Sequence, residues 1–210
     1  MGAKLRRLSG GPLLTMKKTA PEIRKEIRHY LGQLPSAQRL QLTHLAIENF
    51  LATAEYRRCK SLAAFFPVRH ELDLRPLMEQ CWRDGKKVFL PPLLPRPFQK
   101  MRFLPYEPYT PMKLNRFQIP EPALSSRHEI PIRQLDIVIT PLLAFGQHGE
   151  RLGMGGGFYD RTFAFLNRSS YIKPRLWAIA LEAQSYELQA NPWDVPIHGV
   201  ATEQEIYRYA

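Results

Sequence analysis

The chain has 210 residues, of which 44% are hydrophobic and 23% are charged. These proportions are ordinary for a globular protein, so they exclude wholesale disorder, and the length is enough for one domain with its own core. No apolar run approaches the roughly 20 residues that a membrane-spanning helix requires. The only cysteines, Cys59 and Cys81, are far apart in the sequence. This argues against a disulfide scaffold or a zinc site and favours a reducing cytoplasm.

The basic excess is concentrated near the amino terminus. The net charge is +11, and residues 1–28 carry eight basic side chains against two acidic ones. A protein that binds nucleic acid would instead need a basic stripe interleaved with aromatic side chains on one surface. We therefore interpret residues 1–18 as a flexible basic extension before a single domain over residues 19–210. Nucleic-acid binding is the weaker hypothesis.

The first half of the chain alternates helical and extended patterns. Thr19 and Glu22 have the spacing of a capping box, and the apolar residues that follow predict a helix that ends at Pro35. Four further elements are predicted: a helix over residues 36–55, a strand over 61–66, a helix over 73–85 with Asp73 as its cap and Gly85 as its stop, and a strand over 87–90. Such alternation is typical of a parallel sheet with helices on its faces.

The second half adds strands after a long interruption. Residues 91–134 are rich in proline and lack a helical period, so we expect an irregular excursion with an edge strand over 101–106. Further strands are expected over three ranges: 135–140, 176–181 and 199–202. Together the elements predict a single-domain α/β fold: an open, mostly parallel sheet with helices on both faces, in a Rossmann-like three-layer arrangement.

One segment, residues 139–163, suits phosphate chemistry. A buried strand ends at Pro141, a glycine-dense loop follows, and a helix is expected to begin near Phe158. Backbone N–H groups converge in such a loop and the helix dipole adds positive potential, which favours a phosphate group. Arg151 would add a cation, and Asp160 is placed to hold a divalent cation. The alternative is a tight turn whose glycines only permit close packing.

The stretch AFGQHGERLGMGGGFYDR, residues 144–161, resembles the signature of the 5-formyltetrahydrofolate cyclo-ligases, also called 5,10-methenyltetrahydrofolate synthetases. Weaker landmarks follow the family order: ELD at 71–73, IPEP at 119–122 and WDVPI at 193–197. The resemblance covers the chain from about Glu22 onward. It implies a cytoplasmic α/β enzyme that uses ATP and magnesium to convert 5-formyltetrahydrofolate to 5,10-methenyltetrahydrofolate, with release of ADP and phosphate.

The resemblance also implies roles for individual residues. Asp160 and Asp194 would hold magnesium, and Phe66, Glu71 and Phe117 would hold the pterin, although a core role for Phe117 is an equal alternative. The residues implied for ATP are Arg24, Lys25, Arg28, Arg151, Leu152, Gly153, Met154, Gly155, Gly156, Gly157, Phe158 and Tyr159. Those implied for the folate as well are Met154, Gly155, Gly156, Gly157 and Phe158. No side chain is required as a covalent nucleophile, and we expect a monomer.

Two positions depart from the family pattern. The family usually has an aspartate where this chain has Gly146; if that carboxylate orders the loop, the loop should be more mobile here. The family also uses a lysine a few residues before the arginine that aligns with Arg24. That position is Ala20 in this chain, and Lys17 and Lys18 are nearby. These departures keep open the hypothesis of a nucleotide-binding paralogue that acts on another substrate.

Overall fold

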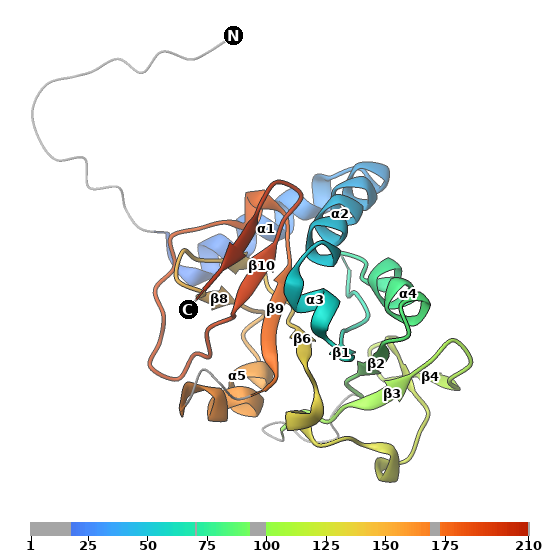
Figure 1. Ribbon diagram of the computed structural model, residues 1–210. Coiled ribbons are helices and arrows are strands. Elements are labelled where there is room, and N and C mark those ends of the chain that lie inside the picture. Colours follow the sequence, from blue (N-terminus) through green and yellow to red (C-terminus); the bar gives the residue numbers. More distant parts are fainter. Residues whose placement is uncertain (1–17, 70, 93–99, 169–172, 210) are drawn as a thin grey trace, which may run out of the picture.

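The computed structural model describes residues 18–69, 71–92, 100–168 and 173–209, and its main feature is a seven-stranded sheet (Figure 1). The strands of this sheet are β1 (Ser61–Ala63), β2 (Lys87–Leu90), β3 (Leu104–Tyr106), β6 (Ile137–Ile139), β9 (Arg175–Ile179), β10 (Gly199–Ala201) and β11 (Ile206–Arg208). The helices are α1 (Ala20–Gln33), α2 (Ser36–Leu51), α3 (Ala54–Arg58), α4 (Arg75–Arg83) and α5 (Phe158–Phe163). Two separate ribbons pair β4 (Met112–Leu114) with β5 (Pro120–Pro122), and β7 (Ala144–Phe145) with β8 (Arg151–Leu152). Short 3-10 helices are η1 (Ser126–His128), η2 (Ile132–Gln134), η3 (Ala164–Arg168) and η4 (Glu182–Gln184).

The strand order places a switch point between β1 and β6. The order is β11-β10-β9-β6-β1-β2-β3, in which neighbours from β10 to β2 are parallel and the edge strands β11 and β3 are antiparallel. Counted along the chain, the parallel strands follow the order 2-1-3-4-5, so the direction of winding reverses between β1 and β6. Ligands bind outside the carboxyl ends of the strands at such a reversal. The topology alone therefore indicates where a site should lie.

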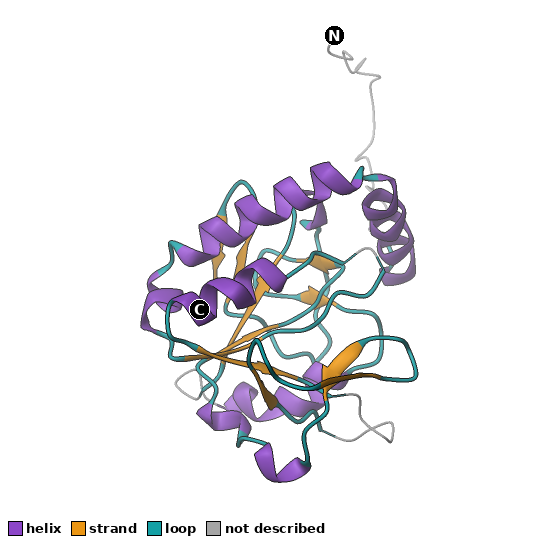
Figure 2. Ribbon diagram, turned by 90° about the vertical axis from the view of Figure 1, so that its right-hand side faces the viewer, coloured by secondary structure: helices purple, strands orange, loops and turns teal. Residues whose placement is uncertain are grey.

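Each face of the sheet has its own apolar core. Side chains on successive strand residues point to opposite faces: Leu62 belongs to the cluster that includes α1, α2 and α4, whereas Ala63 belongs to the cluster that includes α5 and η3. Figure 2 shows long helices on one side of the strands and only short helices on the other. Trp177 and Phe50, with ring centroids 5.4 Å apart, are both fully buried on the α1 and α2 side. Burial of a large apolar side chain contributes about 1.5–3 kcal/mol to the stability of the fold. The mostly parallel sheet with helices on both faces confirms the predicted fold class.

Several elements differ from their predicted bounds. The helix expected over residues 36–55 is two helices, because Thr53 starts α3 by accepting a hydrogen bond from the Tyr56 N–H at 3.1 Å. The strand expected over 61–66 ends at Ala63, and α4 begins at Arg75, whose N–H donates to Asp73 at 3.0 Å. The ribbon of β7 and β8 and the edge strand β11 were not predicted. The strand over 87–90 is present with the expected bounds.

The first described residues, 18 and 19, lead directly into helix α1. The carboxylate of Glu22 accepts a hydrogen bond from the Thr19 backbone N–H at 2.7 Å, as the capping-box spacing predicts. Of the expected basic extension, residues 1–17 lie outside the described residues, Lys17 included, and the Lys18 ammonium pairs with Glu26 at 2.5 Å. Within the described ranges, no helix combines the length and the apolar character needed to cross a membrane.

Candidate functional site

Two adjoining cavities lie at the carboxyl ends of the central strands. The loop cavity, of about 350 Å³, surrounds the glycine loop, which we define as residues 153–157. The switch-point cavity, of about 690 Å³, lies where β1 and β6 end. Pro141 and Met154 line both cavities. The reversal in strand order therefore coincides with the larger cavity, as the topology predicts.

The glycine loop exposes backbone in conformations that other residues rarely adopt. Gly155 has φ +97° and Gly157 has φ +61°, and Gly157 starts the short helix α5. Because α5 has only six residues, its dipole contributes less than the sequence suggested, so the backbone N–H groups of the loop are the main candidates to bind a phosphate. The whole run from Arg151 to Asp160 lines the loop cavity.

A buried arginine forms one wall of the loop cavity. The Arg151 side chain is 6% exposed, and it donates to the carboxylate of Asp160 at 2.6 Å. Its guanidinium also lies over the Tyr159 ring, 5.5 Å from the centroid, and burial raises the pKa of that tyrosine. The buried Arg151 Nε finds no acceptor among the described residues. A rigid cation with an unused donor beside bare backbone N–H groups suits an anionic ligand.

Helix α1 brings one arginine to each cavity. Arg24 Nε donates to the Gly153 carbonyl at 2.9 Å, and Arg24 lines the loop cavity. Arg28, one helical turn later, contacts the Met154 sulfur at 3.6 Å and lines the switch-point cavity instead. Lys25 is exposed and lines neither cavity. Of the three basic residues of α1 implied for ATP, Arg24 alone lines the loop cavity.

The two aspartates implied for magnesium both line the loop cavity. Asp160 Oδ1 accepts from Arg151 and, at 3.3 Å, from the Val195 N–H, while Asp194 Oδ2 accepts from Asn191 N and Nδ2 at 2.8 and 3.0 Å. The described residues contain no cluster of three or more His, Cys, Asp or Glu that could hold a metal. Magnesium needs only one or two carboxylates when phosphates and water complete its octahedron. The donor set therefore fits a cation that arrives with a nucleotide, and does not fit a resident metal.

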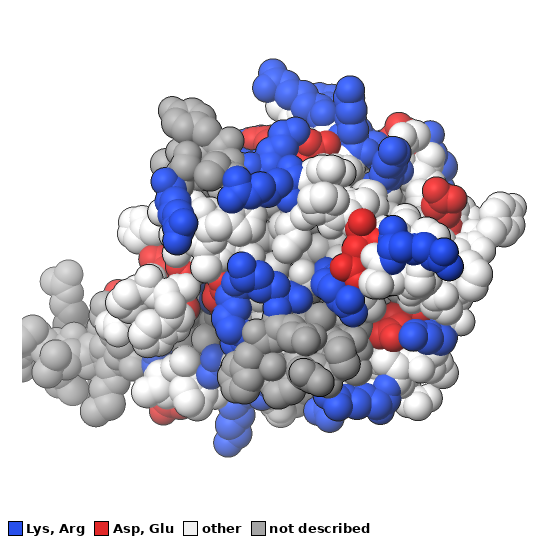
Figure 3. Space-filling model, turned by 90° about the horizontal axis from the view of Figure 1, so that it is seen from below, with Lys and Arg blue, Asp and Glu red and all other residues white. Residues whose placement is uncertain are grey.

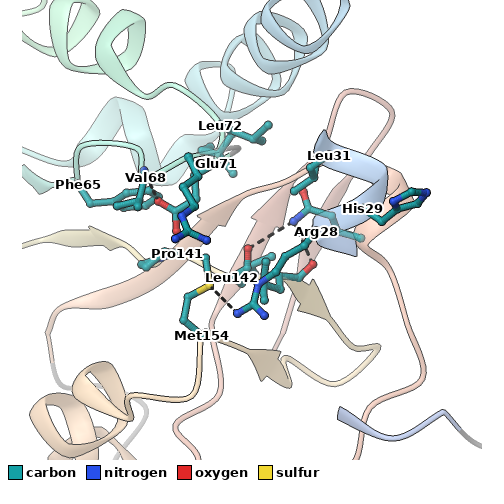
Figure 4. A pocket seen from close by; sticks show the side chains of 14 residues that line it. Arg28, His29, Leu31, Phe65, Val68, Glu71, Leu72, Pro141, Leu142 and Met154 are labelled. Carbon is teal, nitrogen blue, oxygen red and sulfur yellow. Dashed lines mark hydrogen bonds between the residues drawn. The ribbon is translucent and has the colours of Figure 1, made fainter. Parts of the chain in front are cut away.

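The switch-point cavity is largely apolar with one carboxylate in its wall. Phe65 and Glu71 enter from the segment after β1, and Leu142 from the segment after β6. Glu71 Oε2 accepts from the Val68 N–H at 2.9 Å, and burial raises the pKa of this carboxyl despite that hydrogen bond. Figure 4 shows Glu71 and Arg28 on opposite walls. An apolar cavity with few polar groups is typical of a site for a small organic ligand.

The other residues implied for the pterin lie elsewhere. Phe66 lines a third cavity, of about 190 Å³, together with Phe65 and Phe158. Phe117 is 60% exposed beside the guanidinium of Arg116, so the alternative of a core role is wrong. Phe117 lines none of the three cavities described here. Of the loop residues implied for the folate, Met154 alone is among those that line the switch-point cavity.

The buried thiols are remote from this chemistry. Cys59 and Cys81 are free, and burial raises their pKa values to about 11 and about 12. A thiol with so high a pKa is a poor nucleophile at neutral pH. His148 is exposed in the turn between β7 and β8, where its backbone N–H donates to the Glu150 carboxylate at 2.8 Å.

Basic side chains do not form a single stripe on the face that Figure 3 presents. Among the described residues, Lys and Arg lie there in separate groups with Asp and Glu between several of them. This distribution differs from the continuous basic surface that a nucleic-acid-binding protein requires.

Comparison with known proteins assigns the chain to a family. Residues 16–203 match the sequence model of the 5-formyltetrahydrofolate cyclo-ligase family. The chain belongs to this family. It is 39% identical to the 5-formyltetrahydrofolate cyclo-ligase of Haemophilus influenzae over 85% of this chain and 95% of that one. It is 36% identical to that of Escherichia coli K12 over 87% of this chain and all of that one.

Solved structures share the fold. The 5,10-methenyltetrahydrofolate synthetase of Aquifex aeolicus superposes with a TM-score of 0.75 at 26% identity, covering 90% of this chain and 92% of that one. The Mycoplasma pneumoniae synthetase superposes with a TM-score of 0.68, covering 89% and 99%, and at 19% identity this is a likeness of fold alone.

The departure from the family at Gly146 is accommodated by a nearby carboxylate. A Cβ atom at Gly146 would lie 2.3 Å from Glu150 Oε2, so the Glu150 side chain fills the space beside this glycine. The same oxygen accepts the His148 N–H, and the Gly146 N–H donates to the Glu150 carbonyl at 2.9 Å. The Glu150 carboxylate therefore lies in this turn, beside the position where the resemblance implies an aspartate.

Some lining residues were not predicted from the sequence. Trp193, 69% exposed, lines the loop cavity with Asn191, and Gln184 lines the switch-point cavity. Trp193 lies in the WDVPI landmark, so the family match offered a signal for it. Pro141 and Leu142 directly follow a predicted strand, and the switch-point rule would have found them once the strand order was known. Gln184 lies in a short 3-10 helix that no sequence pattern marked.

Proposed function

We propose that this protein converts 5-formyltetrahydrofolate to 5,10-methenyltetrahydrofolate at the expense of ATP, releasing ADP and phosphate. The observation that carries the proposal is a pair of adjoining cavities of different chemistry in a member of the cyclo-ligase family. One offers backbone N–H groups and a buried arginine, and the other offers an apolar enclosure with one carboxylate. ATP and a folate differ in the same way.

The chemistry requires that both ligands meet. A formamide carbon is a poor electrophile, so the formyl oxygen first attacks the terminal phosphorus of ATP and ADP leaves. The neighbouring folate amine then attacks the activated carbon, the carbon–oxygen bond breaks, phosphate leaves, and the amine proton passes to solvent. Pro141 and Met154, which line both cavities, mark where the formyl oxygen and the terminal phosphate would meet.

The residues would contribute mainly position and charge. We assign the ATP phosphates to the glycine loop, Arg24 and Arg151, because preorganised donors stabilise the charge that develops during phosphoryl transfer. Asp160 and Asp194 would hold magnesium, which neutralises phosphate charge when bound. Glu71 would accept hydrogen bonds from the amide-like N–H and amino groups of the pterin. Side-by-side placement of the two ligands accounts for the rest of the catalysis.

The setting of the enzyme is a further part of the proposal. Two free, buried thiols support a reducing compartment such as the cytoplasm. We also propose a monomer, because a single copy of the chain suffices to line both cavities. Light scattering after size-exclusion chromatography gives the mass in solution that tests this.

A spectroscopic assay tests the reaction. Methenyltetrahydrofolate absorbs where 5-formyltetrahydrofolate does not, so absorbance should rise when the protein, 5-formyltetrahydrofolate, ATP and magnesium are combined. Omission of ATP should abolish the rise, and ADP should accumulate in equal amount to the product. A well-folded protein that binds ATP but gives no absorbance change would instead support the paralogue hypothesis.

A further inference from the structure

We propose that Arg28 binds the glutamate carboxylates of the folate substrate at the rim of the switch-point cavity. The proposal rests on the proposed function and deepens it. It gives Arg28 a ligand other than the ATP phosphates that the family resemblance implied.

The geometry of α1 separates its two arginines. Arg24 and Arg28 are one turn apart on the same helix face, and they contact consecutive residues, the Gly153 carbonyl and the Met154 sulfur. The boundary between the two cavities passes between these contacts, because Gly153 lines only the loop cavity of the two, whereas Met154 lines both. Helix α1 thus supplies one cation to each cavity.

The charges of the larger cavity orient a folate within it. A folate carries N–H and amino donors at its pterin end and carboxylates at its glutamate end. Glu71 accepts hydrogen bonds and repels carboxylates, so the pterin end belongs beside it. Arg28 reaches the cavity from the opposite wall, with Pro141 and Leu142 between (Figure 4). The glutamate end then lies toward Arg28, and the apolar middle of the ligand contacts the apolar lining.

Arg28 is available for this role. It is exposed, and its contact is to a thioether sulfur, which is a weak acceptor. A guanidinium forms two parallel hydrogen bonds to a carboxylate, which is stronger than the sulfur contact that it would replace. His29 also lines the cavity, but its side chain points away from the cavity interior (Figure 4). Arg69 follows β1 on the same segment as Glu71 and is the competing cation.

The test compares 5-formyltetrahydrofolate with 5-formyltetrahydropteroate, which lacks the glutamate. For Arg28→Ala we expect the KM for the folate to rise about tenfold, as for loss of a charge-assisted hydrogen bond, with kcat and the KM for ATP within twofold of wild type. With the pteroate, wild type and Arg28→Ala should have equal KM values. Arg28→Lys should recover part of the folate affinity.

Controls separate this role from the others. Arg58→Ala removes an exposed arginine from α3, which precedes the amino end of β1 and lines neither cavity, and should change neither KM. A raised KM for ATP with an unchanged KM for the folate in Arg28→Ala would overturn the proposal in favour of a phosphate contact. Equal losses with both folate and pteroate, or a glutamate effect that disappears in Arg69→Ala instead, would also overturn it. Absence of methenyl formation by the wild-type protein would contradict the proposed function itself.

Discussion

The loop cavity and the switch-point cavity are built in opposite ways. Residues 151–160 line the loop cavity without interruption, whereas the switch-point cavity takes its lining from α1, the segments after β1 and β6, the glycine loop, the end of β9 and η4. The loop cavity is lined by four glycines and four charged side chains beside aromatic ones, and the switch-point cavity is lined mainly by apolar side chains. Successive backbone N–H groups of one loop can bind a phosphate. Side chains from several separate segments can instead fit the shape of one particular organic ligand.

This difference predicts that substitutions in the two cavities change the kinetic constants for different ligands. Changes in the glycine loop should alter the constants for ATP, and changes at the switch point should alter those for the folate. Residues 146–150, which form the turn between β7 and β8 and line neither cavity, should affect neither ligand selectively.

The largest effect is expected for Gly155→Val. At φ +97° a branched side chain is strained, and the loop must change conformation and move its N–H groups away from the phosphates. We expect kcat/KM for ATP to fall by about a hundredfold or more, the scale of losing a preorganised donor. Binding of the folate alone, measured by calorimetry, should change little.

Gly85→Val is the matched control for that strain. Gly85 follows α4 with φ +68°, and a Cβ there meets nothing within 4 Å, so the variant has a similar backbone cost away from either cavity. It should lose stability while keeping its kinetic constants. Normal ATP kinetics in Gly155→Val would show that the loop only permits packing.

The next effect is expected for the two aspartates. Asp160→Asn weakens the ion pair with Arg151 and removes a carboxylate implied for magnesium, and Asp194→Asn removes the other. Each should lower turnover about tenfold or more and raise the magnesium concentration needed for half-maximal rate. The double variant should be far from additive if both act on one cation. Single variants within twofold of wild type would rule out the metal assignment.

A smaller and pH-dependent effect is expected for Glu71→Gln. The pterin needs ionised Glu71 as acceptor, so the KM for the folate should rise as pH falls through the raised pKa of this carboxyl. In Glu71→Gln the KM should be higher at neutral pH and should lose this pH-dependent limb, with the KM for ATP unchanged. An unaltered pH profile would remove Glu71 from the folate site.

The same substitution should affect stability in the opposite direction. Burial raises the Glu71 pKa above the ordinary 4.5, so the folded state favours the proton. The stability due to the protonated form is complete below pH 4.5 and is lost as pH rises through the raised pKa. Glu71→Gln should therefore have a higher Tm than wild type at pH 7, and the difference should shrink below pH 4.5. A gain of stability with a loss of folate affinity is the signature of a binding residue.

The contrast between the cavities also explains how much the sequence predicted. The strand over 87–90 was exact because a short apolar run lies between Gly85 and Pro91, and the loop cavity was predicted because its chemistry lies in one contiguous motif. The sequence could not predict which cavity Arg28 lines. Helical spacing puts Arg28 on the same face as Arg24, but the packing of α1 against the ribbon of β7 and β8 decides which cavity each arginine lines.

Tertiary context likewise decided the position of Phe117. It lies in the turn of the ribbon formed by β4 and β5, and a ribbon of three-residue strands carries too little pattern to predict its pairing or its exposed side. The two-residue strands β7 and β8 are likewise too short to be predicted from a sequence pattern, although Gly149, with φ +88°, lies in their turn.

The smallest effect is expected for Gly146→Ala in the turn between β7 and β8. Two opposing contributions decide whether this substitution raises or lowers Tm. Gly146 does not have a positive φ, so Gly146→Ala would ordinarily stabilise by about 0.4–1 kcal/mol through the unfolded chain. Here the new methyl group would displace the Glu150 carboxylate and free the His148 N–H, a loss of about 1 kcal/mol or more. We therefore expect Gly146→Ala to lower Tm by about 2 °C or less, with both KM values within twofold of wild type. A Glu150→Ala background removes the carboxylate and leaves the Cβ of residue 150 at 3.1 Å from the new methyl group, so the same substitution should lower Tm less there than with Glu150 intact. A rise in Tm with Glu150 intact would show that this carboxylate does not order the turn.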